Sequence, residues 1–211
     1  MTPTRRSRPR GEVRRTQLVE IAAQVFLENG YGGTTIDLVA ARAEASKATI
    51  YSFFGDKQAL FATIVQDRTE RILSAFLDIE PARRDVQAAL VHIARRYLEI
   101  VLAPEAVGLY RLIIAEGARF PDVAETFYHC GPKRISEHFA DILGQWRERG
   151  LIALDDPALT AAQFLEGVRG DLHLRVMAGL APQDLDAAVE YRVQNIVRTL
   201  WNGIRPEATS S

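Results

Sequence analysis

Cysteine and long apolar runs are scarce in this sequence, and both absences narrow what the protein can be. The single cysteine, Cys130, cannot form a disulfide within the chain, which fits a reducing compartment. No apolar run approaches the roughly 18 residues that a membrane-spanning helix needs. The arginine-rich beginning leads into an amphipathic segment that carries Glu20, not into the continuous apolar stretch of a secretion signal. We therefore expect a cytoplasmic protein with no membrane partner.

The sequence also offers little for catalysis. It contains no P-loop and no dinucleotide-binding glycine motif. The four histidines are dispersed along the chain: His92, His129, His138 and His173. Glu137, His138 and Asp141 could begin a metal site, but no further ligand stands at a suitable spacing. We expect no enzyme activity, no catalytic residue, no metal and no cofactor, and we interpret Cys130 as an inert thiol.

Net charge is small overall but unevenly distributed. The chain carries −1, whereas residues 1–15 hold six arginines against a single glutamate, Glu12, for a net charge of +5. Residues 1–57 together carry nine basic and six acidic side chains, which leaves the remainder net acidic. A basic head on an acidic body suits a protein that touches DNA with one end. Arg5, Arg6 and Arg8 can enter the minor groove, or they can form only a solvated tail.

Apolar residues recur at helical spacing through most of the chain, and Gly or Pro stands at nearly every junction. The pattern predicts an all-α protein with about nine helices, no strand and no internal repeat. The expected helices are 12–29, a short one between Thr35 and Glu44, 47–54, 57–79, 82–103, 104–119, 121–149, 157–178 and 182–202. Gly30 is expected to end the first helix in a left-handed conformation. Gly131 and Pro132 must kink the helix that contains them, because proline removes a backbone donor.

The segment from Thr34 to Leu60 holds the most specific pattern. It predicts two short helices around a tight turn, followed at once by the start of a third. Thr34 or Thr35 would cap the first of these helices and Ser46 the second. This is the arrangement of a helix-turn-helix, which places one helix in the DNA major groove. Glu44 lies in the turn, where a positive φ would cost a glutamate on the order of 1 kcal/mol relative to glycine.

These residues resemble the DNA-binding domain of the tetracycline-repressor (TetR) family of transcriptional regulators. The resemblance runs from Asn29-Gly30-Tyr31 through Thr34-Thr35 and Ser46-Lys47-Ala48-Thr49-Ile50-Tyr51 to Phe54, Lys57 and Leu60. Further along, Glu116-Gly117-Ala118-Arg119-Phe120-Pro121 is similar to the C-terminal domain of AefR-like members. The resemblance implies an all-helical homodimer with a small-molecule site in the C-terminal domain that controls DNA affinity.

The expected organisation follows from this resemblance and from the helix pattern. We expect a disordered basic arm (1–11), a helix-turn-helix DNA-binding domain (12–58), a connecting helix (59–80), a C-terminal ligand-binding and dimerisation domain (81–205) and a disordered tail (206–211). The expected partners are double-stranded DNA with a palindromic operator, a second copy of the chain and a small-molecule effector.

The residues expected to contact DNA are Thr35, Ser46, Lys47, Ala48, Thr49, Tyr51, Ser52 and Lys57. Lys47 can donate to guanine O6 or N7, and Tyr51 can reach a base edge or a thymine methyl group. Ala48 offers apolar contact only. The resemblance implies phosphate contacts for Thr35, Thr49, Ser52 and Lys57.

The C-terminal half must provide a dimer interface and perhaps a pocket. By resemblance the last two helices form a four-helix bundle with the partner copy, through Leu165, Val168, Leu172, Val189, Val193, Ile196 and Leu200. The alternative is that these residues face the core of their own chain. Gly167 and Gly170 allow another helix to approach closely. Candidate ligand-binding residues combine apolar bulk with polar groups: Tyr97, Leu109, Tyr110, Ile113, Phe127, Tyr128, Phe164 and His173.

No arginine or carboxylate pair in this half identifies a ligand, so we expect an apolar or amphipathic one, bound near the Gly131-Pro132 break. We expect a homodimeric regulator, most simply a repressor released from its operator by this molecule. Two alternatives stay open at this point. One is a helical ligand-binding protein or enzyme without specific DNA binding, and the other is a DNA-binding regulator without a small-molecule effector.

Overall fold

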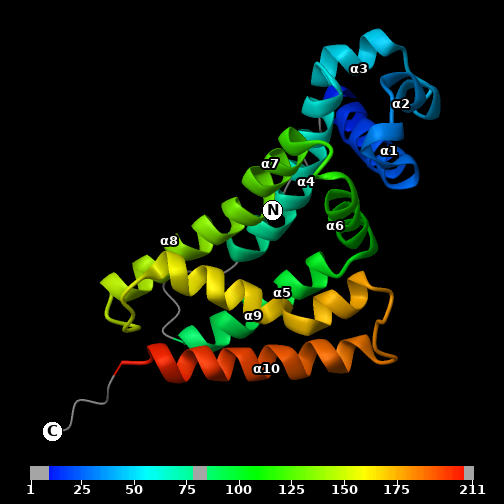
Figure 1. Ribbon diagram of the computed structural model, residues 1–211. Helices are drawn as coiled ribbons and strands as arrows, with labels where there is room; N and C mark the ends of the chain where they lie inside the picture. Colours follow the sequence, from blue (N-terminus) through cyan, green and yellow to red (C-terminus); the bar gives the residue numbers. More distant parts are fainter. Residues whose placement is uncertain (1–9, 78–84, 207–211) are drawn as a thin grey trace, which may run out of the picture. The chain divides into compact units, whose positions relative to one another are not determined.

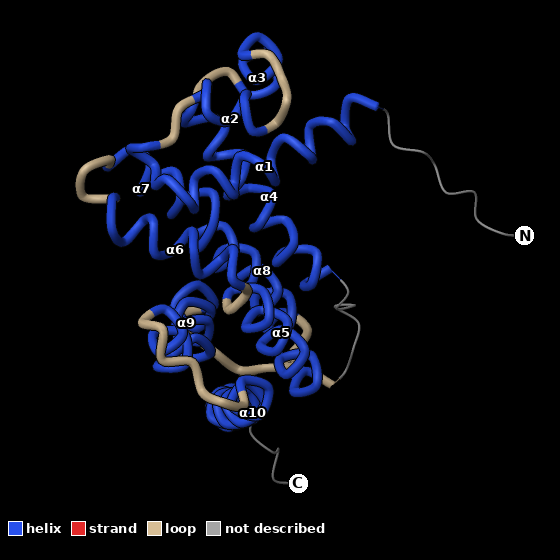
Figure 2. The backbone as a smooth tube through the Cα atoms, turned by 90° about the vertical axis from the view of Figure 1, so that its right-hand side faces the viewer, coloured by secondary structure: helices blue, strands red, loops and turns tan. Residues whose placement is uncertain are grey.

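The computed structural model describes residues 10–77 and 85–206, and every regular element in these residues is a helix (Figures 1 and 2). The all-α prediction is confirmed. The elements are α1 Arg10–Gly33, α2 Ile36–Arg42, α3 Lys47–Phe54, α4 Lys57–Leu77, α5 Val86–Val101, α6 Pro104–Glu116, α7 Pro121–Tyr128, the π-helix η1 His129–Lys133, α8 Arg134–Glu148, α9 Pro157–Met177 and α10 Leu185–Ile204. The predicted count of nine corresponds to these elements when the uninterrupted run of α7, η1 and α8 is counted once.

The chain forms two compact units. The N-terminal unit contains the described residues 10–67 together with 112–127, and the C-terminal unit contains 68–77, 85–111 and 128–206. Helices α4, α6 and α7 each have residues in both units. The sequence analysis placed a boundary at 80/81, which lies outside the described residues. The division into units instead falls within continuous helices.

Aromatic side chains build the core of the N-terminal unit. Phe26 and Phe61 are fully buried. Tyr31 stacks on Phe26 with ring centroids 5.7 Å apart and meets Phe61 edge-on at 5.6 Å. Phe120 lies with its centroid 5.1 Å from that of Tyr31. Residues 112–127 are therefore part of this core although they are distant in the sequence.

The C-terminal unit has its own core, made where α5, α8, α9 and α10 pack against one another. Phe139 of α8 and Phe164 of α9 are buried in it with ring centroids 5.2 Å apart. Gly167 brings α10 close to α9, because a Cβ at this position would lie 2.6 Å from Ile196 Cδ1. The prediction that Gly167 allows close helix approach is confirmed.

Glycine or proline interrupts regular helix at three places. Gly30 has φ 71°, so the predicted left-handed end of the first helix is confirmed. The predicted kink at Gly131 and Pro132 takes the form of η1, because Pro132 has no N–H to continue the α-helical ladder. Gly170, with φ 44°, breaks α9 as well, which the sequence analysis did not predict.

Two predicted helix starts are wrong, and in both the start is set by an aspartate cap. The last helix was expected over 182–202, but Asp184 Oδ1 accepts from Ala187 N at 2.9 Å, so α10 begins at Leu185 and continues through Gly203. The helix expected from residue 82 begins at Val86, because Asp85 Oδ1 accepts from Ala88 N at 2.9 Å. At these two places the capping aspartate determines the helix start more strongly than a nearby proline or glycine does. Its side chain accepts from a backbone N–H that has no partner within the helix.

Candidate nucleic-acid interface and effector site

Helices α2 and α3 begin at the capping side chains that the sequence predicts. Thr35 Oγ1 accepts from Leu38 N at 3.2 Å, and Ser46 Oγ accepts from Thr49 N at 3.0 Å. Each such cap typically contributes about 1 kcal/mol to helix stability. Thr34 is buried instead, and its hydroxyl donates to the Gly30 carbonyl at 2.7 Å. Thr35 is thus the cap, and Thr34 closes the break after α1.

The turn between α2 and α3 requires a left-handed backbone conformation at Glu44. Glu44 has φ 48°, and no other non-glycine residue in the described part of the chain has a positive φ. This left-handed conformation costs an L-residue roughly 1–2 kcal/mol. Arg14 of α1 supports the turn, because its Nη2 donates to the Ala43 carbonyl at 2.9 Å. One arginine of the basic head therefore serves the fold of the turn.

One face of α3 is buried and the other is available to DNA. Ile50 and Phe54 face the core. The opposite face exposes Lys47, Ala48, Tyr51 and Ser52. Tyr51 has 52 % of its surface exposed, so its ring and hydroxyl group are available for contact. The helix thus presents a cation, a small residue and an aromatic hydroxyl together.

Lys47 is held by an ion pair with Asp37 of α2, with Nζ and Oδ1 2.6 Å apart. This hydrogen bond and charge raise the pKa of Lys47 above its ordinary value, so the ammonium stays protonated. Both side chains are more than half exposed, and exposed pairs contribute little to stability. Lys47 can therefore exchange Asp37 for an acceptor on DNA at small cost.

Lys57 has a structural role that the sequence analysis missed. Its Nζ donates to the carbonyls of Tyr31 at 2.9 Å and Thr34 at 3.1 Å, and lies 4.3 Å from the centroid of the Tyr31 ring. These carbonyls belong to the break between α1 and α2. The phosphate contact predicted for Lys57 stays a prediction, and the ammonium would have to make it with its remaining N–H.

Glu116, which is distant in the sequence, binds the backbone at the same break near the end of α1. Its carboxylate accepts from Tyr31 N at 2.9 Å and from Gly32 N at 2.7 Å. A Cβ at Gly30 would collide with this carboxylate, so glycine is required there by space as well as by φ. Glu116 of α6 and Lys57 of α4 thus hold the junction between α1 and the helix-turn-helix.

A small cavity in the C-terminal unit combines polar and aromatic residues. Its volume is about 110 Å³, and its lining residues are Tyr97, Tyr128, Pro132, Lys133, Ser136, Ala162, Leu165, Glu166 and Arg169. Tyr97 and Leu165 are buried, whereas Tyr128 is 56 % exposed, so the cavity has a buried floor and an exposed rim. The expectation of a cavity beside the Gly131-Pro132 break is confirmed, since η1 contributes two of the lining residues.

Arg169 dominates the electrostatics of this cavity. Its Nη1 donates to the Tyr110 hydroxyl and its Nη2 forms an ion pair with Glu166. Burial raises the pKa of Tyr97, against the opposing effect of the Arg169 charge, so this phenol stays neutral. The sequence analysis singled out no arginine–carboxylate pair in this half, and the structure adds this pair to the candidate site. The available signal was the spacing of Glu166 and Arg169, which are three residues apart on the same helix.

Two of the eight predicted ligand-binding residues, Tyr97 and Tyr128, line this cavity. Tyr110 accepts a hydrogen bond from Arg169, and His173 packs edge-on against Tyr110 with ring centroids 5.0 Å apart. The remaining four do not line it. Leu109 and Phe164 are buried core residues, and Ile113 and Phe127 belong to the N-terminal unit.

Most residues predicted for the dimer interface face the core of their own chain. Leu165, Val168, Leu172 and Val193 are buried in the core of the C-terminal unit. Val189, Ile196 and Leu200 are partly buried against that core. These four residues pack within their own chain, as the intramolecular alternative expects, and the predicted dimer interface stays a prediction.

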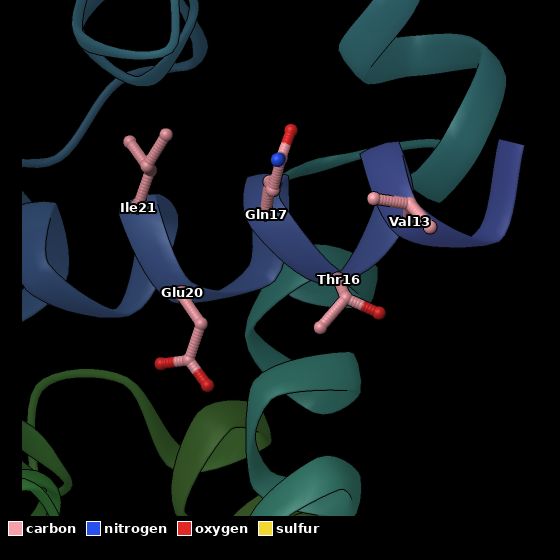
Figure 3. A pocket seen from close by; sticks show the side chains of 5 residues that line it. All are labelled: Val13, Thr16, Gln17, Glu20 and Ile21. Atoms are coloured by element: carbon pink, nitrogen blue, oxygen red, sulfur yellow. The ribbon is translucent and has the colours of Figure 1, made fainter. Parts of the chain in front are cut away.

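Other hollows and clusters are weaker candidates. The hollow in Figure 3, of about 420 Å³, is lined by Val13, Thr16, Gln17, Glu20 and Ile21, all from α1. Their side chains follow one helix and point to different sides of it, so they do not converge on a ligand. Among the described residues, no group of three or more His, Cys, Asp or Glu could hold a metal ion. Over the same residues, no helix is long and apolar enough to cross a membrane.

Comparison with known proteins agrees with this architecture. Residues 18–64 match the bacterial regulatory proteins of the tetR family, and residues 88–202 match the AefR-like transcriptional repressor C-terminal domain. The transcriptional regulator UidR of Escherichia coli K12 is 28 % identical over 177 residues, which are 81 % of this chain and 83 % of UidR. A transcriptional repressor of Streptomyces coelicolor is 30 % identical over 153 residues, which are 70 % and 71 % of the two chains.

Solved structures agree over nearly the full length. The flavonoid-responsive regulator FrrA is 31 % identical, with a TM-score of 0.75, and the match covers 93 % of this chain and 100 % of FrrA. A TetR-family regulator from Mesorhizobium loti is 25 % identical, with a TM-score of 0.81, and the match covers 94 % and 100 %. With a helix-turn-helix at one end, an AefR-like domain at the other and full-length relatives of the same fold, the chain belongs to the TetR family of DNA-binding transcriptional regulators.

Proposed function

We propose that the protein is a homodimeric repressor that binds a palindromic operator and leaves it when a small molecule binds the C-terminal unit. The observation that carries the DNA-binding part is the exposed face of α3, where Lys47, Ala48 and Tyr51 are free of core contacts. In a dimer, each copy would place this face in one of two major-groove segments about 34–36 Å apart. Lys47 and Tyr51 would read base edges, and Thr35, Thr49 and Ser52 would contact phosphates.

The effector part of the proposal is supported by the cavity of the C-terminal unit and by one relative. The cavity joins buried aromatic surface to a few polar groups, which is the composition of small-molecule sites. FrrA is described as flavonoid-responsive, and it matches this chain over 93 % of its length. An aromatic, amphipathic effector fits both observations. Helices α4, α6 and α7 continue from one unit into the other and would carry the effect of binding.

Selection of bound duplexes from a random DNA pool by the full-length protein tests this function. We expect a palindromic sequence to be enriched. The double variant Lys47→Ala, Tyr51→Ala should fold normally and lose about 2–6 kcal/mol of operator binding, since each good base contact provides about 1–3 kcal/mol of discrimination. Band-shift titrations and circular dichroism measure the two properties. The exposed Glu125→Ala variant is the control.

Operator binding by the double variant at wild-type affinity would show that α3 does not read the bases. Failure of the folded wild-type protein to enrich any sequence at low salt would contradict the proposed operator binding. Titration of the enriched duplex with salt then counts the phosphate contacts, because the slope of affinity against salt grows with their number.

A further inference from the structure

The Arg169 side chain is more strongly buried than its charge would suggest. Only 12 % of the side chain is exposed, and it lines the cavity together with Tyr97 and Leu165. A guanidinium carries five N–H donors, and the structure gives Arg169 two side-chain acceptors, the Tyr110 hydroxyl and the Glu166 carboxylate. Its Nε is buried and has no acceptor within the described part of the chain. A buried donor without an acceptor costs free energy of folding, so the fold alone does not account for an arginine at this position.

The carboxylate of Glu166, which pairs with Arg169, is exposed to solvent and can be displaced. Glu166 is 67 % exposed, and its ion pair with Arg169 spans one turn of α9. Moving an exposed carboxylate from such an ion pair back into water costs little free energy. A ligand carboxylate in the cavity could take the place of Glu166 at Nη2, because guanidinium groups form strong charge-assisted hydrogen bonds with carboxylates.

The other lining residues fit the rest of such a ligand. Lys133 of η1 adds a second cation, whose Nζ lies 3.8 Å from Glu137 Oε1 and 3.5 Å from His129 Nδ1. Ser136 adds a hydroxyl group. Tyr97 and Tyr128 supply aromatic surface on the floor and the rim. The lining of the cavity therefore contains two cations, Lys133 and Arg169, and one carboxylate, Glu166, together with the two tyrosine rings.

Size limits what the cavity can hold. An apolar cavity of about 150 Å³ takes up a benzene ring. At about 110 Å³, with an exposed rim, this cavity has room for a carboxylate and part of one ring. A longer effector would leave its remaining atoms at the rim, against Tyr128.

We propose that Arg169 is an anion receptor and that the effector is an aromatic carboxylate, whose charged group binds Arg169 and Lys133 while its ring lies between Tyr97 and Tyr128. This inference rests on the proposed function for its biological meaning, but the binding site can be tested without DNA.

The test is calorimetric titration of the full-length protein with benzoate and with naphthoate, each compared with its uncharged amide. We expect saturable binding of a carboxylate in the millimolar range or tighter, with the amide at least about tenfold weaker, because the charge-assisted bonds are lost. Arg169→Gln should abolish carboxylate binding. Glu166→Gln should strengthen it several-fold, since the competing carboxylate is removed. The exposed Glu148→Gln on α8 is the matched control and should change nothing.

Opposite effects at Arg169 and Glu166 would support the receptor, because a residue that only maintains the fold would not give tighter binding when its partner is neutralised. Equal binding of acid and amide, no binding of either carboxylate, or weaker binding by Glu166→Gln would each overturn it. If Arg169→Gln fails to fold, as judged by circular dichroism, the Glu166 variant and the acid–amide comparison still decide.

The same titration separates this inference from the proposed function. Carboxylate binding without operator binding would keep the receptor and reject the repressor. Operator binding without carboxylate binding would do the reverse. When both occur, release of the operator by the carboxylate but not by its amide is the expected joint result.

Discussion

Two single residues of this protein adopt states that cost free energy, because Glu44 has a strained backbone and His173 is a buried polar group. Glu44 bends the backbone between α2 and α3 with φ 48°, although glycine would do so with less strain. Its side chain is exposed, so nothing in the core requires a glutamate there. The strain is tolerated because Ser46 and Arg14 fix both sides of the turn.

Replacement of Glu44 by glycine should therefore stabilise the protein. We expect a gain of about 0.5–1 kcal/mol in the free energy of unfolding, since relief of the left-handed strain is partly offset by the greater freedom of glycine in the unfolded chain. Urea denaturation followed by circular dichroism measures the change. Glu44→Ala keeps the strain and serves as control. A loss of stability in Glu44→Gly would mean that the carboxylate itself holds the turn.

His173 is a buried group whose charge state depends on pH. Burial lowers the pKa of His173 below 6.5, and the nearby positive charge of Arg169 lowers it further, whereas Glu166 acts in the opposite direction. The unfolded chain then binds a proton at a higher pH than the folded chain. The corresponding stability is present above about pH 6.5 and is lost as the pH falls towards the lower folded value.

The free energy of unfolding should thus fall more steeply between pH 7 and pH 5 for the wild-type protein than for His173→Asn, which cannot be protonated there. Urea denaturation at a series of pH values gives both curves. The exposed His92→Asn variant should follow the wild type. Parallel curves for the wild type and His173→Asn would contradict the lowered pKa.

Among the elements, the end of α1 receives support from two other helices. Glu116 on α6 accepts from the amides of Tyr31 and Gly32, and Lys57 on α4 donates to the carbonyls of Tyr31 and Thr34. Polar groups of opposite charge therefore satisfy the donors and acceptors that the break at Gly30 leaves open. The position of α2 and α3 relative to α1 depends on this junction.

Glu116→Gln should weaken the junction without changing its size. An amide places a donor where one backbone N–H needs an acceptor, and the charge assistance is lost. We expect a destabilisation of about 1–2 kcal/mol and weaker operator binding, because the recognition helix is less firmly placed. Urea denaturation and band-shift titration measure the two effects, with the exposed Glu125→Gln on α7 as control. Unchanged stability and affinity would remove any structural role for the carboxylate.

The sequence predicted local features well and contacts between distant residues poorly. Thr35, Ser46 and Gly30 act through neighbours within a few residues, so propensity and capping rules suffice for them. Lys57 and Glu116 act on a junction 26 and 85 residues away, and nothing in the local pattern reveals that. Leu165 and Val193 show the same limit, because an apolar helix face looks alike whether it packs within a protomer or between two.

On the scale of the whole chain, positive charge is concentrated near the beginning. The six arginines of residues 1–15 stand against a net charge of −1 for the complete protein. Arg14 contacts the turn, but Arg5, Arg6 and Arg8 lie outside the described residues, and their predicted contact with the minor groove stays a prediction. Their contribution can be measured in solution.

Replacement of Arg5, Arg6 and Arg8 by glutamine should weaken operator binding at low salt and reduce its salt dependence. Each lost phosphate contact lowers the slope of log affinity against log salt by about 1. Band-shift titrations at several salt concentrations give the slope, and Arg205→Gln near the other end of the chain is the matched charge control. An unchanged slope would identify this segment as a solvated tail.

The discontinuous make-up of the N-terminal unit sets a condition for engineering. A chimeric regulator joins the DNA-binding part of one protein to the C-terminal part of another. The simplest junction lies just after the helix-turn-helix. A head made of residues 1–67 alone would leave behind Glu116 and Phe120, which satisfy the amides and cover the ring of Tyr31. A functional chimera must therefore transfer residues 112–127 together with residues 1–67.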